Sequence, residues 1–240
     1  MTIYCNYNTL IKGYFLIIIM VLTEINGQGL KFKIDFPRVD ENGLVEGRVL
    51  LLISKHNEKE PRFQISDDHS TGFVYGVDVI GKQSSKFVMI DGNTFGYPIS
   101  SLNDIPKGDY WVQGLIHKYE TFNLKTGHEV KLPMDRGEGQ HWYSAPGNFY
   151  SKPKKINLDP NKPKTVTIFL DQVIPPIIPP KDTDYIKHIK IQSKLLTEFW
   201  GRPMHLGAHV LLPYGFEDHP DAKYPLMIFH GHFPADFGGF

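Results

Sequence analysis

Short stretches in which apolar and polar residues alternate dominate the chain between residues 30 and 170. Segment 31–36 (KFKIDF) alternates with a period of two, and segment 165–170 places Val166, Ile168 and Leu170 on one side. This alternation is typical of half-buried β-strands. We therefore predict strands at 31–36, 48–53, 73–79, 86–90, 110–119 and 165–170.

Turn residues separate these segments at short intervals. The sequences DGN at 91–93, PKGD at 106–109 and KTG at 125–127 supply the fixed or positive φ angles that tight turns require. No helical pattern longer than two turns accompanies them. The fold class expected for residues 28–172 is mainly β, an antiparallel immunoglobulin-like sandwich.

A proline-rich segment ends this region. Four of the eight residues at 173–180 (VIPPIIPP) are proline, which cannot enter a helix or a central strand. We place an extended linker at 173–184 and a second unit at 185–240. In that unit strands are expected at 186–193, 204–213 and 224–231, and the run 226–229 (LMIF) has the two apolar faces of a strand buried in a covered sheet.

The amino terminus has the order of a secretory signal. Lys12 precedes ten apolar residues at 13–22, and the small residue Gly27 follows a polar stretch. Ten residues are too few to span a bilayer, which needs about 20. We expect residues 1–27 to be cleaved, leaving no stable membrane span, and the mature protein to be periplasmic or extracellular; an uncleaved signal anchor is the alternative.

The charge balance narrows the classes of partner. The 240-residue chain has 26 Lys and Arg against 26 Asp and Glu, so it lacks the basic footprint of a nucleic-acid-binding protein. No phosphate-binding glycine loop or dinucleotide motif occurs. We expect no nucleic acid, no cofactor and no metal. The only cysteine, Cys5, lies in the predicted signal.

The second unit carries the pattern HVLLPYG at 209–215, then a polar loop, then YPLMIFHG at 224–231. In order and spacing, residues 193–231 resemble the opening of an exported esterase family of the α/β-hydrolase superfamily. The resemblance implies that the loop after the last strand supplies a backbone N–H to the oxyanion hole. The matching positions here are Gly231, His232 and Phe233.

The resemblance also implies a Ser, Asp or Glu, and His triad downstream of this loop. No Gly-x-Ser-x-Gly motif occurs in the 240 residues. The expectation is therefore an incomplete α/β-hydrolase domain that is not catalytic as given. Segments 131–142 and 146–150 also resemble β-rich modules that precede esterase domains in large exported bacterial proteins.

An aromatic and glycine-rich segment at 135–150 is the candidate binding loop of the sandwich. Its ring-bearing residues could stack on sugar rings or fill a pocket. The alternative is a loop folded over a sheet edge, with the rings as a satellite core. The candidate residues are His141, Trp142, Tyr143, Phe149 and Tyr150.

Three metal-ligating groups can also be read from the sequence, and we favour none of them. They are Asp135 with Glu138 and His141, the pair His230 and His232, and the pair His205 and His209. Five lysines at 152–164 are expected to form a solvated turn.

Three hypotheses of function follow. The first is an exported serine esterase, of which this chain is the amino-terminal part, acting on an ester substrate. The second is a non-catalytic secreted sandwich that binds glycan or protein. The third is a structural interdomain module.

Overall fold

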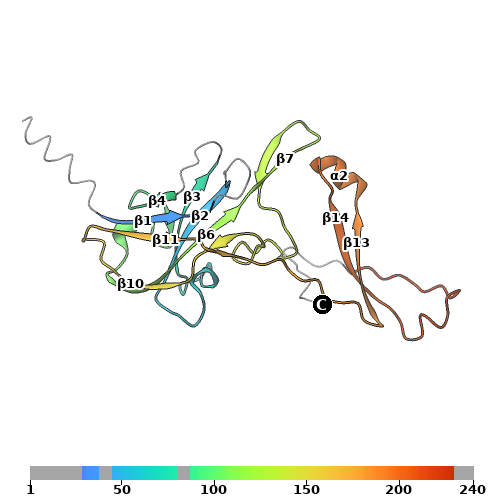
Figure 1. The fold of residues 1–240 in the computed structure, drawn as a ribbon. Coiled ribbons are helices and arrows are strands. Elements are labelled where there is room, and N and C mark those ends of the chain that lie inside the picture. The colour runs from blue at the N-terminus through green and yellow to red at the C-terminus, as the bar shows by residue number, and fades with distance from the viewer. Residues whose placement is uncertain (1–28, 38–44, 81–86, 230–240) are drawn as a thin grey trace, which may run out of the picture.

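The computed structural model describes residues 29–37, 45–80 and 87–229. The predicted signal segment lies outside the described residues, as do the oxyanion candidates Gly231, His232 and Phe233. The described chain is mainly β, with several sheets and one short α-helix (Figure 1).

The smaller sheet of the sandwich has three strands in the order β11-β1-β4. They are β1 (Leu30–Asp35), β4 (Phe87–Ile90) and β11 (Lys164–Phe169). β1 pairs antiparallel with β4 but parallel with β11. The prediction of a wholly antiparallel sandwich was wrong at this pair. A parallel pair needs a long connection, and most of the sandwich lies between β1 and β11 in the chain.

The larger sheet follows the order β12-β9-β6-β2-β3-β5, and β10 pairs with the start of β6. All of its pairs are antiparallel. Its strands are β2 (Gly47–Ser54), β3 (Phe73–Val79), β5 (Gly96–Tyr97), β6 (Gly108–Lys118), β9 (Phe149–Tyr150), β10 (Lys154–Leu158) and β12 (Gln172–Val173). Single 3-10 turns occur at Pro61–Phe63 and Leu102–Asp104.

The main core lies between the two sheets. Tyr110, Val112 and Ile116 of β6 face Val166 and Ile168 of β11 there, as the alternation predicted. On the other face of the larger sheet, a second apolar cluster consists of Leu50, Leu52, Leu115 and Ile174.

Gly47 begins β2 with φ at 154°, and a Cβ at this position would lie 2.1 Å from the backbone oxygen of His117. The absence of a side chain there allows β2 and β6 to pair closely.

The segment after the linker forms a two-stranded antiparallel sheet of β13 (Ile186–Gln192) and β14 (His205–Leu211), joined through helix α2 (Lys194–Trp200). The helix was not among the predicted elements. Ser193 caps it by accepting a hydrogen bond from the Leu196 N–H, and Gly201 ends it with φ at 67°. Serine and glycine at these two positions are ordinary helix start and stop signals.

The strand predicted within 224–231 is not formed in its described part. Residues 222–229 have no regular structure, and Leu226, Met227, Ile228 and Phe229 are 82%, 89%, 80% and 85% exposed. An apolar run becomes a strand only when a neighbour accepts its backbone hydrogen bonds, and within the described chain none pairs with it. No hydrolase domain is present among the described residues.

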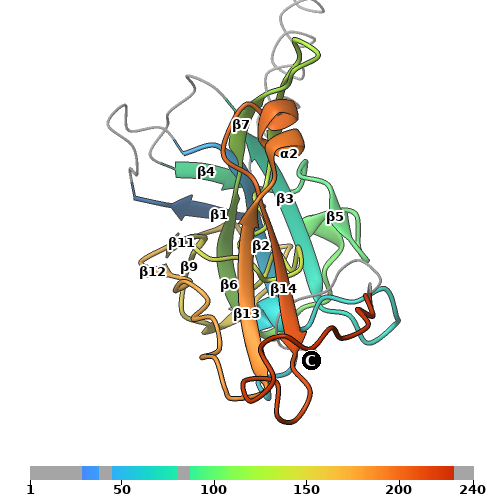
Figure 2. The same cartoon turned by 90° about the vertical axis from the view of Figure 1, so that its right-hand side faces the viewer.

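Helix α2 contacts the hairpin of β7 (Glu120–Asn123) and β8 (Glu129–Leu132), which extends from the end of β6. Both views place α2 beside β7 (Figures 1 and 2). The Lys125 N–H donates to the Phe199 carbonyl at 2.9 Å, and the rings of Phe122 and Trp200 meet edge to face with centroids 5.3 Å apart. The second unit is therefore attached to the sandwich by specific contacts as well as by the linker.

Glu120 strengthens this contact. Its carboxylate accepts hydrogen bonds from Arg202, which follows α2, and from Arg136 of the aromatic loop. The guanidinium of Arg202 also lies 5.0 Å from the centre of the Phe122 ring. One side chain of β7 thus connects the second unit and the aromatic loop.

Candidate functional site

The predicted binding loop folds back over the outer face of the larger sheet. Trp142 and Tyr150 pack against the second apolar cluster. Phe149 turns the other way into the main core, where it is 9% exposed. The rings of these three residues are used in packing, those of Trp142 and Tyr150 against the second cluster and that of Phe149 in the main core.

His141 and Tyr143 remain half-buried and form part of an aromatic strip with Phe63. The rings of His141 and Tyr143 stack with centroids 5.4 Å apart and an interplanar angle of 21°. The Phe63 ring meets Tyr143 edge-on at 5.5 Å and is 41% exposed. Two predicted residues thus meet one that the sequence reading missed.

A buried polar network joins the 3-10 turn that carries Phe63 to the loop that carries His141 and Tyr143. Arg62 donates from Nε to Glu60 at 2.8 Å and from Nη1 to the carbonyl of Tyr143 at 3.0 Å. Gln113, fully buried on β6, accepts from the Arg62 N–H and donates to Glu60 and to the Ser151 carbonyl. Because buried polar groups are costly unless paired, this network fixes the loop positions.

The guanidinium of Arg62 is also enclosed by rings. It lies 4.5 Å from the centre of Phe63 and 4.1 Å from that of Tyr150. Arg62 as a whole is only 9% exposed. Its charge is therefore used inside the protein and is not presented to a ligand.

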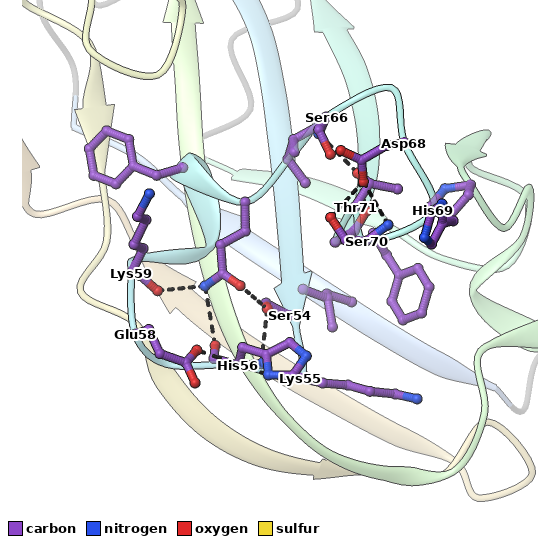
Figure 3. Close-up of a pocket in the computed structure, with 17 residues that line it drawn as sticks. Ser54, Lys55, His56, Glu58, Lys59, Ser66, Asp68, His69, Ser70 and Thr71 are labelled. Atoms are coloured by element: carbon purple, nitrogen blue, oxygen red, sulfur yellow. Dashed lines mark hydrogen bonds and ion pairs between the residues drawn. The ribbon is translucent and has the colours of Figure 1, made fainter.

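Phe63 also borders a cleft of about 650 Å³ formed mainly by the connection between β2 and β3. Two groups of polar side chains lie across from each other around it (Figure 3). One group is Ser54, Lys55, His56, Glu58 and Lys59, and the other is Ser66, Asp68, His69, Ser70 and Thr71. Phe63, Phe73 and Pro98 supply apolar surface.

The walls of the cleft are fixed by their own hydrogen bonds. The Gln64 side chain accepts from the Ser54 hydroxyl at 2.6 Å and donates to the carbonyls of His56 and Lys59. Opposite, Asp68 accepts from the hydroxyl and the N–H of Ser70, and these bonds lower the pKa of its carboxyl. Asp68 is therefore an anion at neutral pH.

The carboxylates of the possible metal-ligating group of Asp135, Glu138 and His141 bind backbone N–H groups of their own loop. Asp135 accepts from the Gly137 N–H at 2.8 Å, and Glu138, 4% exposed, accepts from the Arg136 N–H at 2.7 Å. Both carboxylates shape the backbone of the loop. Across the part of the chain that the structure describes, no three His, Cys, Asp or Glu side chains are grouped as metal ligands.

Of the two histidine pairs considered as metal ligands, only His205 and His209 lie among the described residues. His205 and His209 both lie on β14, where the His209 ring meets His188 of β13 edge to face at 4.6 Å. His230 and His232 lie outside the described residues. All five lysines for which we predicted contact with solvent are exposed, at positions 152, 154, 155, 162 and 164.

In comparisons with known proteins, no family model, curated protein or solved structure matches this chain. Among the described residues, no helix is long and apolar enough to cross a membrane.

Proposed function

We propose that this chain is the amino-terminal part of an exported esterase-type hydrolase, in which residues 185–240 open the hydrolase domain and the sandwich, of immunoglobulin-like type, is an accessory module. The observation that carries the proposal is the antiparallel pair of β13 and β14, followed by Leu-Pro-Tyr-Gly at 212–215. The resembled family opens with the same arrangement.

The segment after β14 supports the same assignment. Gly215 has φ at 73°, and hydrogen bonds from Phe216 to Pro213 and from Asp218 to Gly215 make a run of tight turns. The apolar run 226–229 follows with its side chains exposed. In the resembled family this run is the first strand covered on both faces, where each large side chain gains about 1.5–3 kcal/mol on burial.

The accessory role rests on the contact between α2 and the β7–β8 hairpin. That contact brings together Phe122, Trp200 and the ion pair of Lys125 with Glu198. A module held in this way keeps a set orientation relative to the strands that follow. In the full-length protein that we propose, the sandwich would lie in a fixed orientation beside the hydrolase domain.

The second candidate is a non-catalytic secreted sandwich that binds glycan or protein. The half-exposed rings of Phe63, His141 and Tyr143 beside a polar cleft favour it. The two candidates differ in whether the natural gene product contains an activated serine.

Labelling of the natural gene product distinguishes them. An antibody against the sandwich isolates the product from its source, and a fluorophosphonate probe then reports an activated serine. We expect covalent labelling of a product longer than 240 residues, and no labelling of the 240-residue chain made alone. A natural product that carries the sandwich and does not react would contradict the hydrolase proposal.

A further inference from the structure

We propose that the cleft between β2 and β3, together with the aromatic strip of Phe63, Tyr143 and His141, is a binding site for a neutral oligosaccharide. All of its residues belong to the sandwich. The inference therefore does not depend on a hydrolase in the second unit, and it gives the second candidate function a defined site and ligand class.

The aromatic strip supplies one half of the chemistry. Each sugar ring has a face of C–H groups, which packs on the flat surface of an aromatic ring while its hydroxyls point sideways to polar partners. Phe63 lies where the strip meets the cleft, because its ring both contacts Tyr143 and lines the cleft wall. A saccharide seated in the cleft can therefore continue over the exposed edge of the strip.

The cleft supplies the other half. Imidazole and carboxylate groups lie on both of its walls, ammonium groups on one and most of the hydroxyls on the other, so hydrogen-bond donors and acceptors are available to a ligand rich in hydroxyls. Its volume of about 650 Å³ is in the ordinary range for small-ligand sites, about 300–1,000 Å³. A purely apolar ligand would displace water from these polar groups without replacing the hydrogen bonds of that water.

The charges of the cleft select a neutral ligand. Among the side chains that line the cleft, the charges of Lys55 and Lys59 are balanced by those of Glu58 and Asp68. An anionic chain would gain from the lysines and lose against the carboxylates. The nearby guanidinium of Arg62 does not alter this balance, because it is buried against Glu60.

The site is also organised before a ligand arrives. Gln64 fixes the backbone of one wall at His56 and Lys59, and Arg62 holds the Tyr143 backbone beside Phe63. A binding surface that is ordered in advance loses less conformational entropy on association. This is the expected design for a weakly interacting ligand such as a sugar.

A glycan array carrying neutral and acidic oligosaccharides tests the proposal, with titration calorimetry of the hits on the folded chain. We expect binding to neutral oligosaccharides with an affinity that does not change between low and high salt, since no net charge is neutralised. Phe63→Ala and Tyr143→Ala should each weaken binding about tenfold, which corresponds to about 1.4 kcal/mol. Tyr143→Phe keeps the ring and should bind as the unaltered chain does.

The matched control is Phe169→Ala, which removes a ring that is 62% exposed on β11, in the other sheet. It should leave binding unchanged. Phe63→Leu retains apolar packing without a flat ring, and it replaces Phe63→Ala if that variant does not fold. Binding to no neutral glycan, binding only to acidic glycans in a salt-dependent manner, or equal affinity in the Phe63 and Phe169 variants would each overturn the proposal.

Discussion

At Gly47 the backbones of β2 and β6 approach so closely that no side chain fits between them. We expect Gly47→Ala to lower the free energy of unfolding by about 1–3 kcal/mol, because the new methyl group meets a backbone oxygen that cannot rotate away. Urea denaturation measures the change. The control is Gly108→Ala, where the nearest atom to a Cβ lies 3.5 Å away in ordinary contact; a similar loss in both variants would show that tightness at Gly47 is not the cause.

His117 makes the stability of the sandwich depend on pH. Burial lowers the pKa of His117 from 6.5 to about 4, so the folded state disfavours its charged form. Above pH 6.5 the ring is neutral in both states and the full stability is present. Between about pH 6.5 and 4 the unfolded chain binds the proton first, so stability falls as the pH falls, by at most about 1.4 kcal/mol per pH unit.

Replacing His117 by glutamine should flatten this part of the stability curve, as measured by denaturation at a series of pH values. His56→Gln is the control, because His56 is exposed in the cleft wall. An unchanged slope in His117→Gln would assign the pH dependence to other groups.

At the level of elements, alternation or an apolar run placed β1, β2, β3, β4, β6 and β11. The other strands of this region were not predicted; β5, β9 and β12 are only two residues long, too short for alternation to show. Alternation could not give the pairing of β1 with β11, since the direction of two strands depends on the whole path between them. Helix α2 has its cap signals at Ser193 and Gly201, but a seven-residue helix is too short for its periodicity to stand out. The run 226–229 has the composition of a buried strand, but nothing in the described chain buries it.

Only part of the candidate site was predicted, because the rest of it depends on contacts between distant parts of the chain. His141 and Tyr143 drew attention as aromatic residues in a long loop. Phe63 and the cleft did not, because they depend on a contact between two loops that are far apart in sequence. The network of Arg62, Glu60 and Gln113 that joins those loops has no local sequence signal.

The contact of α2 with the β7–β8 hairpin should control how the second unit is held. Removing the Trp200 ring in Trp200→Ala takes away the edge-to-face contact with Phe122, worth about 1 kcal/mol. Hydrogen exchange of β13 and β14 should become faster while that of β1 and β11 does not change. Leu195→Ala, at a position of the same helix that is 78% exposed, should leave both unaltered; equal exchange in the two variants would contradict the docking role.

At the scale of the whole molecule, export should remove the first 27 residues. The prediction rests on Lys12, the apolar run 13–22 and Gly27. Mass spectrometry of the protein recovered outside the cytoplasm should give a chain that starts at Gln28 and has no cysteine. A secreted form that retains Met1 would favour the signal anchor instead.

The parallel pairing of β1 with β11 has a mechanical consequence. If the protein is held at its amino terminus and pulled from beyond residue 170, the two strands are drawn in opposite directions along their common axis. The hydrogen bonds between residues 30–35 and 164–169 are then loaded together in shear and do not break one after another. Single-molecule pulling in this direction should therefore need more force than separating β13 from β14 by pulling at the paired residues Ile186 and Leu211. Equal forces would contradict this prediction. A sandwich tethered in this way could bear tension between a surface and whatever follows it in the chain.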